Sequence, residues 1–247
     1  MAGRSRLDVI LVQRGLAESC EKARAAIMAG SVVVDERPAV KAGTLVAPDA
    51  DIRVLAGPRF VSRGGEKLAH ALDVFALNVG GMTVVDVGAS TGGFTDCLLQ
   101  RGAARVYAVD VGRGLLDWRL RQDPRVVVME RVNVRHLECL PEKGDLATID
   151  VSFISLEKVI PPVVSLLRGD ARIVTLVKPQ FQARREEVGK GGVVRDPQVH
   201  AAVLGRFIAW CAGRRLRLLG LTTSPLLGPA GNKEFFVLLG VPAEAVS

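Results

Sequence analysis

The sequence predicts an α/β fold built on a parallel sheet, with a small α+β module in front of it. Five β-branched runs recur at intervals of roughly 20 residues and are separated by helical or loop segments, which indicates βαβ units. Two further apolar runs are joined by a loop rich in proline and glycine. The runs cover residues 83–87, 105–109, 125–129, 146–150 and 172–177, then 216–222 and 234–240.

The composition limits the chain to a few broad classes. A length of 247 residues with 49% hydrophobic residues suits one medium α/β domain and a small second module. The net charge of +7 favours a polyanionic partner, nucleic acid first and an anionic membrane second. Charge alone does not decide this, because many basic proteins bind neither.

The spacing of the cysteines and the short length of the apolar runs predict a cytoplasmic location. The four cysteines form no CxxC pair, which predicts free thiols, no disulfide framework and no metal site. No signal peptide opens the chain, and charges interrupt every apolar run before the roughly 18 residues that a bilayer span needs. We therefore expect a cytoplasmic protein without a membrane segment, and a monomer is compatible with the sequence. The cysteines are Cys20, Cys97, Cys139 and Cys211.

Residues 1–57 are predicted to form the small module. Leu7, Ile10 and Leu11 recur at helical spacing before Gly15, and Ser19 can cap a second helix that ends near Gly30. Residues 31–35 and 51–55 are predicted strands, with a turn at 36–38 after the first of them. The module contains, in order, Arg6-Leu7-Asp8, Arg14-Gly15-Leu16, Ser19, Lys22-Ala23, Gly30, Val32-x-Val34-Asp35 and Pro38-x-Val40-Lys41.

This order resembles the S4 RNA-binding domain. The resemblance implies an RNA-facing surface, although Cys20 stands where that domain usually carries a basic residue, so one phosphate contact is missing. The alternative is a solvated basic face that binds no RNA. The cations of the expected surface are Arg4, Arg6, Arg14, Lys22, Arg24 and Lys41.

The stretch Ala56-Gly57-Pro58 opens a predicted linker, which we place at 58–62, and a second domain follows over 63–247. That domain begins with an amphipathic helix, in which Leu68, Ala71, Leu72 and Phe75 follow helical spacing. Lys67 lies about 100° from Leu68, at the border of the apolar stripe. It can extend into a neighbouring cleft, or it can be an ordinary surface lysine.

A glycine-rich turn connects the strand at 83–87 to a helix start. Its sequence is Asp86-Val87-Gly88-Ala89-Ser90-Thr91-Gly92-Gly93-Phe94. Such a strand–turn–helix unit points backbone N–H groups at a ligand, and Gly88, Gly92 and Gly93 permit close approach. The turn is neither G-x-G-x-x-G nor a Walker A motif, which favours a Rossmann-like site for a cofactor without phosphates. S-adenosylmethionine is such a cofactor, and NAD is not excluded.

Polar residues also stand at the carboxyl ends of the predicted strands, where an open α/β sheet binds its ligand. Asp110 comes about 24 residues after Asp86, at the distance of an acid that accepts hydrogen bonds from ribose hydroxyls. Asp86 is either structural or meets the amino group of the cofactor through water. The full set is Asp86, Asp110, Asn133, Asp150 and Lys178.

Glu234 starts the last apolar run, where its carboxylate can reach back over the sheet end toward Lys178. Together with Lys67 and Asp150, these residues place two cations and two anions at one cleft. Methylation of an alcohol removes its proton while the oxygen attacks a sulfonium methyl. A lysine accepts that proton only if burial or a second cation disfavours its charged form, and Lys67 beside Lys178 supplies the second cation. The alternative is an ordinary ion-pair network.

Several longer motifs extend this pattern over almost the whole chain. They are Ser62-Arg63-Gly64-Gly65-Glu66-Lys67-Leu68, Asp86–Thr95, Asp110-Val111-Gly112, Asp123-Pro124-Arg125-Val126, Asp150–Leu156, Leu176–Phe181 and Gly191–Pro197. Together they resemble the TlyA family, bacterial proteins that combine an S4 domain with an FtsJ-like methyltransferase domain.

The resemblance implies methyl transfer from S-adenosylmethionine to the 2'-hydroxyl of a cytidine in ribosomal RNA, without a metal. It places a catalytic tetrad on Lys67, Asp150, Lys178 and Glu234. It places the cofactor on Gly88, Ser90, Gly92, Gly93, Phe94 and Asp110, with Asn133 or Val134 near the adenine.

Two other functions remain open for such a chain. Some members of the family have been called haemolysins, but the sequence shows no spanning segment and no basic amphipathic helix of the membrane-surface kind. An RNA-binding protein with an inactive methyltransferase domain is the other alternative. The intact tetrad argues against it.

Overall fold

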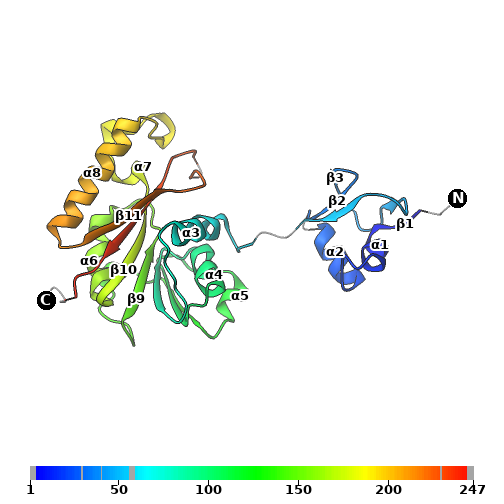
Figure 1. Ribbon diagram of the computed structural model, residues 1–247, viewed down its shortest axis with the longest axis horizontal. Coiled ribbons are helices and arrows are strands. Elements are labelled where there is room, and N and C mark those ends of the chain that lie inside the picture. Colours follow the sequence, from blue (N-terminus) through cyan, green and yellow to red (C-terminus); the bar gives the residue numbers. More distant parts are fainter. Residues whose placement is uncertain (1–3, 29, 40, 56–58, 229, 244–247) are drawn as a thin grey trace. The chain divides into compact units, whose positions relative to one another are not determined.

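The computed structural model describes residues 4–28, 30–39, 41–55, 59–228 and 230–243 (Figure 1). The chain divides into two compact units, Met1–Arg59 and Phe60–Ser247. This division falls between residues of the predicted linker at 58–62, and residues 56–58 lie outside the described residues.

The first unit is a small α+β module with two antiparallel sheets. Strand β1 pairs with β4, and β2 pairs with both β3 and β5. Two helices cover a compact apolar core that includes Leu7, Leu11 and Ile27. As predicted, Ser19 caps the second helix, because its Oγ accepts a hydrogen bond from the Lys22 N–H at 3.2 Å. The elements are β1 (Ser5–Arg6), α1 (Leu7–Gln13), α2 (Cys20–Met28), β2 (Val32–Val34), β3 (Arg37–Pro38), β4 (Leu45–Val46) and β5 (Ile52–Val54).

The turn after β2 differs from the prediction. It lies at Asp35-Glu36, which have φ angles of 48° and 64°, and not at residues 36–38. Arg37 and Pro38 instead form β3 and pair with β2. Two successive left-handed residues suit the tight turn of a hairpin, and Pro38 is tolerated because β3 is an edge strand.

The second unit has a seven-stranded sheet of order β11-β12-β10-β9-β6-β7-β8. Five strands are parallel, as the sequence predicted. Of the other two strands only β12 is reversed, since it runs antiparallel to both β10 and β11. The strands are β6 (Thr83–Val87), β7 (Arg105–Asp110), β8 (Val126–Glu130), β9 (Gly144–Ile149), β10 (Leu167–Val177), β11 (Arg217–Thr223) and β12 (Phe235–Gly240).

Helices cover both faces of this sheet (Figure 1). Alternate strand residues face opposite layers, so Val84 packs in the layer of α3 and α4, whereas Val85 packs in the layer of α6 and α8. The helices are α3 (Arg63–Val74), α4 (Gly93–Gln100), α5 (Trp118–Arg121), α6 (Ile160–Ser165), α7 (Pro179–Gln182) and α8 (Pro197–Gly213), with short 3-10 turns at Val134–His136, Leu156–Lys158, Arg185–Glu187 and Lys190–Gly192. Within the described part of the chain, none of these helices is long and apolar enough to cross a membrane.

Candidate active site

The glycine-rich turn after β6 lies very close to two neighbouring segments. Gly88 has a φ of +84°, and a Cβ there would come within 2.3 Å of the backbone oxygen of Asp150. A Cβ on Gly93, the first residue of α4, would come within 2.2 Å of Ser62 Oγ at the start of α3. Only glycine allows these approaches, so the turn holds the ends of β6 and β9 and the starts of α3 and α4 in one place.

Two cavities meet at this turn and share Gly88, Ser90 and Asp150. The first, of about 240 Å³, is polar and contains all four residues of the predicted tetrad. It is lined by Ser62, Arg63, Gly64, Lys67, Gly88, Ala89, Ser90, Thr91, Gly93, Phe94, Asp150, Lys178 and Glu234.

The second cavity, of about 440 Å³, is more apolar and lies beyond the ends of β7 and β9. It contains the predicted Asp110 and Asn133, and Val134 beside them. Its remaining lining comes from Val87, Gly88, Ser90, Val109, Val111, Leu115, Val132, Asp150, Val151, Ser152, Phe153, Ile154 and Val159.

Backbone N–H groups hold the Asp110 carboxylate in a fixed orientation. One oxygen accepts from the Ser90 N–H at 2.8 Å and the other from the Gly112 N–H at 2.7 Å. Asn133, which lines this cavity, caps the short helix after β8 by accepting from the Arg135 N–H at 3.1 Å.

Asp86 and Gly92 lie beneath the turn and line neither cavity. Asp86 is fully buried and accepts from Thr95 Oγ1 at 2.6 Å and Thr148 Oγ1 at 2.8 Å. Burial raises the pKa of this carboxyl to about 6, and the two hydroxyl hydrogen bonds oppose the rise. Of the two roles predicted for Asp86, these contacts suit the structural role and not a water-mediated contact to the amino group of the cofactor. A Cβ on Gly92 would come within 2.2 Å of Leu120, so this glycine packs against α5.

The tetrad forms two ion pairs. Lys67 Nζ lies 2.6 Å from Glu234 Oε2, with side chains that are 9% and 1% exposed. Lys178 Nζ lies 2.6 Å from Asp150 Oδ1 and donates to Ser152 Oγ at 3.1 Å, in a more open position. Each lysine is therefore oriented by a carboxylate.

The partner of Glu234 differs from the prediction, because it contacts Lys67 and not Lys178. Asp150 and Lys178 follow the adjacent strands β9 and β10, so these two side chains meet directly. Glu234 precedes β12, on the other side of β10, where Lys67 of α3 reaches it.

Several lining residues were not recognised in the sequence. Arg63 lies in the first cavity, and the described residues provide no carboxylate within 4 Å of it. Since the two ion pairs are neutral, Arg63 gives this cavity an excess positive charge. Phe153, with a φ of +62°, is 90% exposed at the second cavity and packs on Phe181 with a centroid distance of 4.7 Å. Both residues lie within motifs of the family resemblance, Ser62–Leu68 and Asp150–Leu156, and that membership is the signal that could have identified them.

The cations predicted to bind RNA in the first unit are all exposed, but three of them also have internal partners. Arg6 and Arg24 form salt bridges with the buried Asp8, at 2.8 and 2.9 Å. The hydrogen bond from Arg6 is the main reason why the pKa of Asp8 lies well below its usual range. Arg14 donates to the carbonyls of Ala50 and Pro48. Arg4, Lys22 and Lys41 complete the predicted set.

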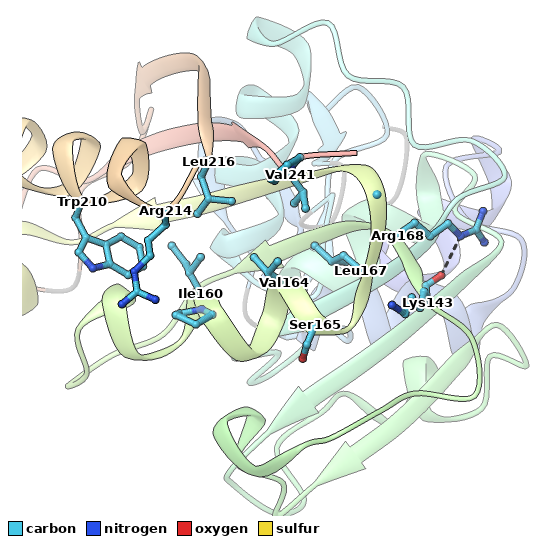
Figure 2. Close-up of a pocket in the computed structure, with 13 residues that line it drawn as sticks. Lys143, Ile160, Val164, Ser165, Leu167, Arg168, Trp210, Arg214, Leu216 and Val241 are labelled. Atoms are coloured by element: carbon cyan, nitrogen blue, oxygen red, sulfur yellow. Dashed lines mark hydrogen bonds between the residues drawn. The ribbon is translucent and has the colours of Figure 1, made fainter. Parts of the chain in front are cut away.

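A third cavity, of about 310 Å³, lies at the opposite ends of the strands, between α6, the end of α8 and the start of β10 (Figure 2). Its floor is apolar, and the Arg214 guanidinium lies 5.5 Å from the centre of the Trp210 ring. None of its lining residues is an acid or a histidine. It therefore offers no acid–base pair, and we place the active site at the turn.

Among the residues that the structure describes, no three His, Cys, Asp or Glu side chains are grouped in a way that could hold a metal ion.

Comparison with known proteins assigns both units. An FtsJ-like methyltransferase model matches residues 60–241, and an S4 domain model matches residues 5–52. The chain belongs to the TlyA family of FtsJ-like methyltransferases. It is therefore an enzyme, and the two cavities lie in its methyltransferase domain.

Three similar proteins cover nearly all of the chain. "Putative rRNA methyltransferase YqxC" of Bacillus subtilis is 51% identical, over 98% of this chain and 87% of that protein. "16S/23S rRNA (cytidine-2'-O)-methyltransferase TlyA" of Mycobacterium tuberculosis is 49% identical, over 97% of this chain and 91% of that protein. A solved structure described as "Putative hemolysin from Streptococcus thermophilus" is 42% identical, with a TM-score of 0.74 over 98% of this chain and 90% of that one.

Proposed function

We propose that this protein transfers a methyl group from S-adenosylmethionine to the ribose 2'-hydroxyl of a cytidine in ribosomal RNA. The observation that carries the proposal is the first cavity, where two Lys–carboxylate pairs face a glycine-rich turn shared with a second cavity. The M. tuberculosis relative is named for this activity, and the S4 match adds an RNA-binding module.

The two cavities together fit S-adenosylmethionine. Asp110 would accept hydrogen bonds from the ribose hydroxyls, and the apolar wall near Asn133 and Val134 would contact the adenine. The methionine portion would pass Gly88, where the absence of a Cβ leaves room, into the first cavity. Ser90, Gly93 and Phe94 line that part of the path. When bound, S-adenosylmethionine supplies a sulfonium methyl group.

The tetrad would prepare the hydroxyl for attack. Asp150 and Ser152 hold Lys178 Nζ. In our proposal Lys178 first releases a proton to solvent, and its neutral amine then accepts the proton of the 2'-hydroxyl while the hydroxyl oxygen attacks the methyl carbon. Glu234 holds Lys67 Nζ in a nearly buried position, where its charge would stabilise the negative charge that develops on that oxygen. The carboxylates thus orient the amines, and Lys178 takes the proton.

Two lining residues support an RNA substrate. Arg63 supplies a positive charge in the cavity that would contact a phosphate next to the target ribose. Phe153 presents an exposed aromatic face at the rim, of the kind on which nucleobases stack. Ribosomal RNA as the substrate places the proposed action in the cytoplasm.

Mapping of 2'-O-methyl groups tests the proposal in cells. Ribosomal RNA from cells with and without the gene for this chain is compared nucleotide by nucleotide. We expect loss of one or more 2'-O-methylcytidines, and a Lys178→Ala copy should not restore them. An unchanged map, or loss of a base methylation in its place, contradicts the proposal.

A further inference from the structure

The segment of residues 184–195, which we call the basic segment, forms an exposed cationic surface beside the tetrad. Arg184, Arg185, Lys190 and Arg195 are all exposed. Within the described residues, none of these four side chains has a carboxylate within 4 Å.

The acids in and next to the basic segment neutralise little of this charge. Glu187 forms a salt bridge with Arg206 of α8 at 2.7 Å, and the hydrogen bond from Arg206 lowers the pKa of Glu187. Asp196 caps α8 by accepting from the Gln198 N–H at 2.8 Å. Glu187 also accepts from the Arg184 backbone N–H at 2.7 Å and attracts the Arg184 side chain, so Glu186 is the one acid of the segment left to oppose Arg185, Lys190 and Arg195.

Two buried side chains fix the end of the basic segment. Asn232 accepts from the Val194 N–H at 2.9 Å and donates to the Gly192 carbonyl at 3.0 Å, and its side chain is buried. His200 of α8 contacts the Val194 carbonyl through Nε2 at 2.9 Å, and its ring packs edge-on against Phe235. A loop that served only as a connection would not need this double attachment.

The same attachments fix the distance between the basic segment and the tetrad. The segment begins six residues after Lys178, across the short helix α7. Asn232 is two residues before Glu234, and the exposed Lys233 lies between them. The Glu234 carboxylate packs against Gly228, whose N–H donates to the Asn232 carbonyl at 2.9 Å. The loop that holds Glu234 therefore also holds the basic segment.

We propose that the basic segment and Lys233 bind the phosphates of the RNA strand that carries the target ribose, and that Asn232 is a positioning residue that sets this strand over the tetrad. Exposed lysines and arginines without carboxylate partners are the usual contacts to phosphates, and such contacts fix the register of a nucleic acid. The inference rests on the proposed function and adds an RNA surface on the methyltransferase domain to the one expected on the S4 domain.

A charge-neutralising double variant tests the surface. Lys190→Gln/Arg195→Gln in the full chain should bind ribosomal RNA several-fold more weakly in filter binding and leave the affinity for S-adenosylmethionine unchanged. The slope of log K against log salt should fall by about 1.5, since each phosphate contact contributes about 0.7 to 0.9. The matched control is Arg172→Gln/Arg217→Gln, which removes two exposed cations that flank Gly240 at the other end of the sheet. Equal RNA affinity and equal salt slopes for the two double variants would overturn the proposal.

Asn232→Ala tests the positioning role. We expect kcat to fall tenfold or more while the affinity for S-adenosylmethionine changes little and the affinity for RNA falls no further than in the charge-neutralising variant. The melting temperature should also fall, because the substitution leaves the Val194 N–H and the Gly192 carbonyl without their partner. Asn232→Asp keeps an acceptor for the Val194 N–H and should recover part of kcat. An unchanged kcat, or a parallel loss of cofactor affinity, excludes a positioning role. If wild-type protein transfers no methyl to RNA, the proposed function fails, whereas the binding measurements above still decide whether the basic segment contacts RNA.

Discussion

Removal of one partner from the Lys67–Glu234 pair should destabilise the methyltransferase domain strongly. Glu234→Leu leaves an ammonium group whose side chain is 9% exposed without its carboxylate at 2.6 Å. Breaking a buried pair in this way typically costs about 3–5 kcal/mol, because the remaining charge is desolvated and uncompensated. Lys67→Met should cost a similar amount, since it leaves a carboxylate that is 1% exposed.

The double variant Lys67→Met/Glu234→Leu should recover most of this loss. Replacement of both charges by apolar groups of similar size is often neutral or stabilising. The coupling free energy should therefore be several kcal/mol. For the Lys178–Asp150 pair, which is 12% and 24% exposed, the same cycle should give a smaller value.

Urea denaturation followed by tryptophan fluorescence measures this cycle in one domain. The chain has two tryptophans, Trp118 and Trp210, and both lie in the unit from Phe60 to Ser247. If Glu234→Leu lowers the free energy of unfolding by less than about 1 kcal/mol, or if the losses of the two single variants add up in the double variant, Lys67 and Glu234 do not form a stabilising buried pair. All three variants should lack methyl transfer, so the double variant would be folded but inactive.

Three further results are expected. Because burial raises the pKa of Asp86 to about 6, its contribution to stability is complete below about pH 4 and is lost as the pH rises through about 6, by on the order of 3 kcal/mol. Asp86→Asn should remove this part of the pH dependence of the urea midpoint, and parallel profiles for the two proteins would speak against it. Gly88→Ala should weaken S-adenosylmethionine binding at least tenfold in calorimetry, since its Cβ would lie 2.3 Å from the Asp150 carbonyl; an unaltered Kd would show that the turn can relax. Asp110→Ala should cost about 1.5–3 kcal/mol of cofactor affinity with little change in RNA affinity, and the opposite pattern would remove Asp110 from the cofactor site.

The sequence predicts the strands and the turn of the methyltransferase domain well, because their signals are local. The run 83–87 coincides with β6, and the glycines after it lie at the close approaches that the structure shows. Apolar runs carry no information about strand direction, so the reversed strand β12 was not distinguished from the parallel strands.

Pairings across the fold were harder to predict. Lys67 and Glu234 are 167 residues apart, and their contact depends on where α3 lies relative to β12. Similarly, Asp8 shows no sign in the sequence of the salt bridges that it forms with Arg6 and Arg24. A basic residue in an RNA-binding motif therefore predicts that its side chain is exposed, but it does not predict that the side chain lacks a carboxylate partner.

Methyl transfer by the purified protein tests the central claim most directly. Ribosomal subunits are incubated with S-adenosylmethionine, and the digested nucleosides are identified by mass spectrometry. We expect 2'-O-methylcytidine with the wild-type protein and none with Lys178→Ala, at an RNA affinity close to that of the wild type. A base-methylated nucleoside, or an equal rate from Lys178→Ala, would contradict the account.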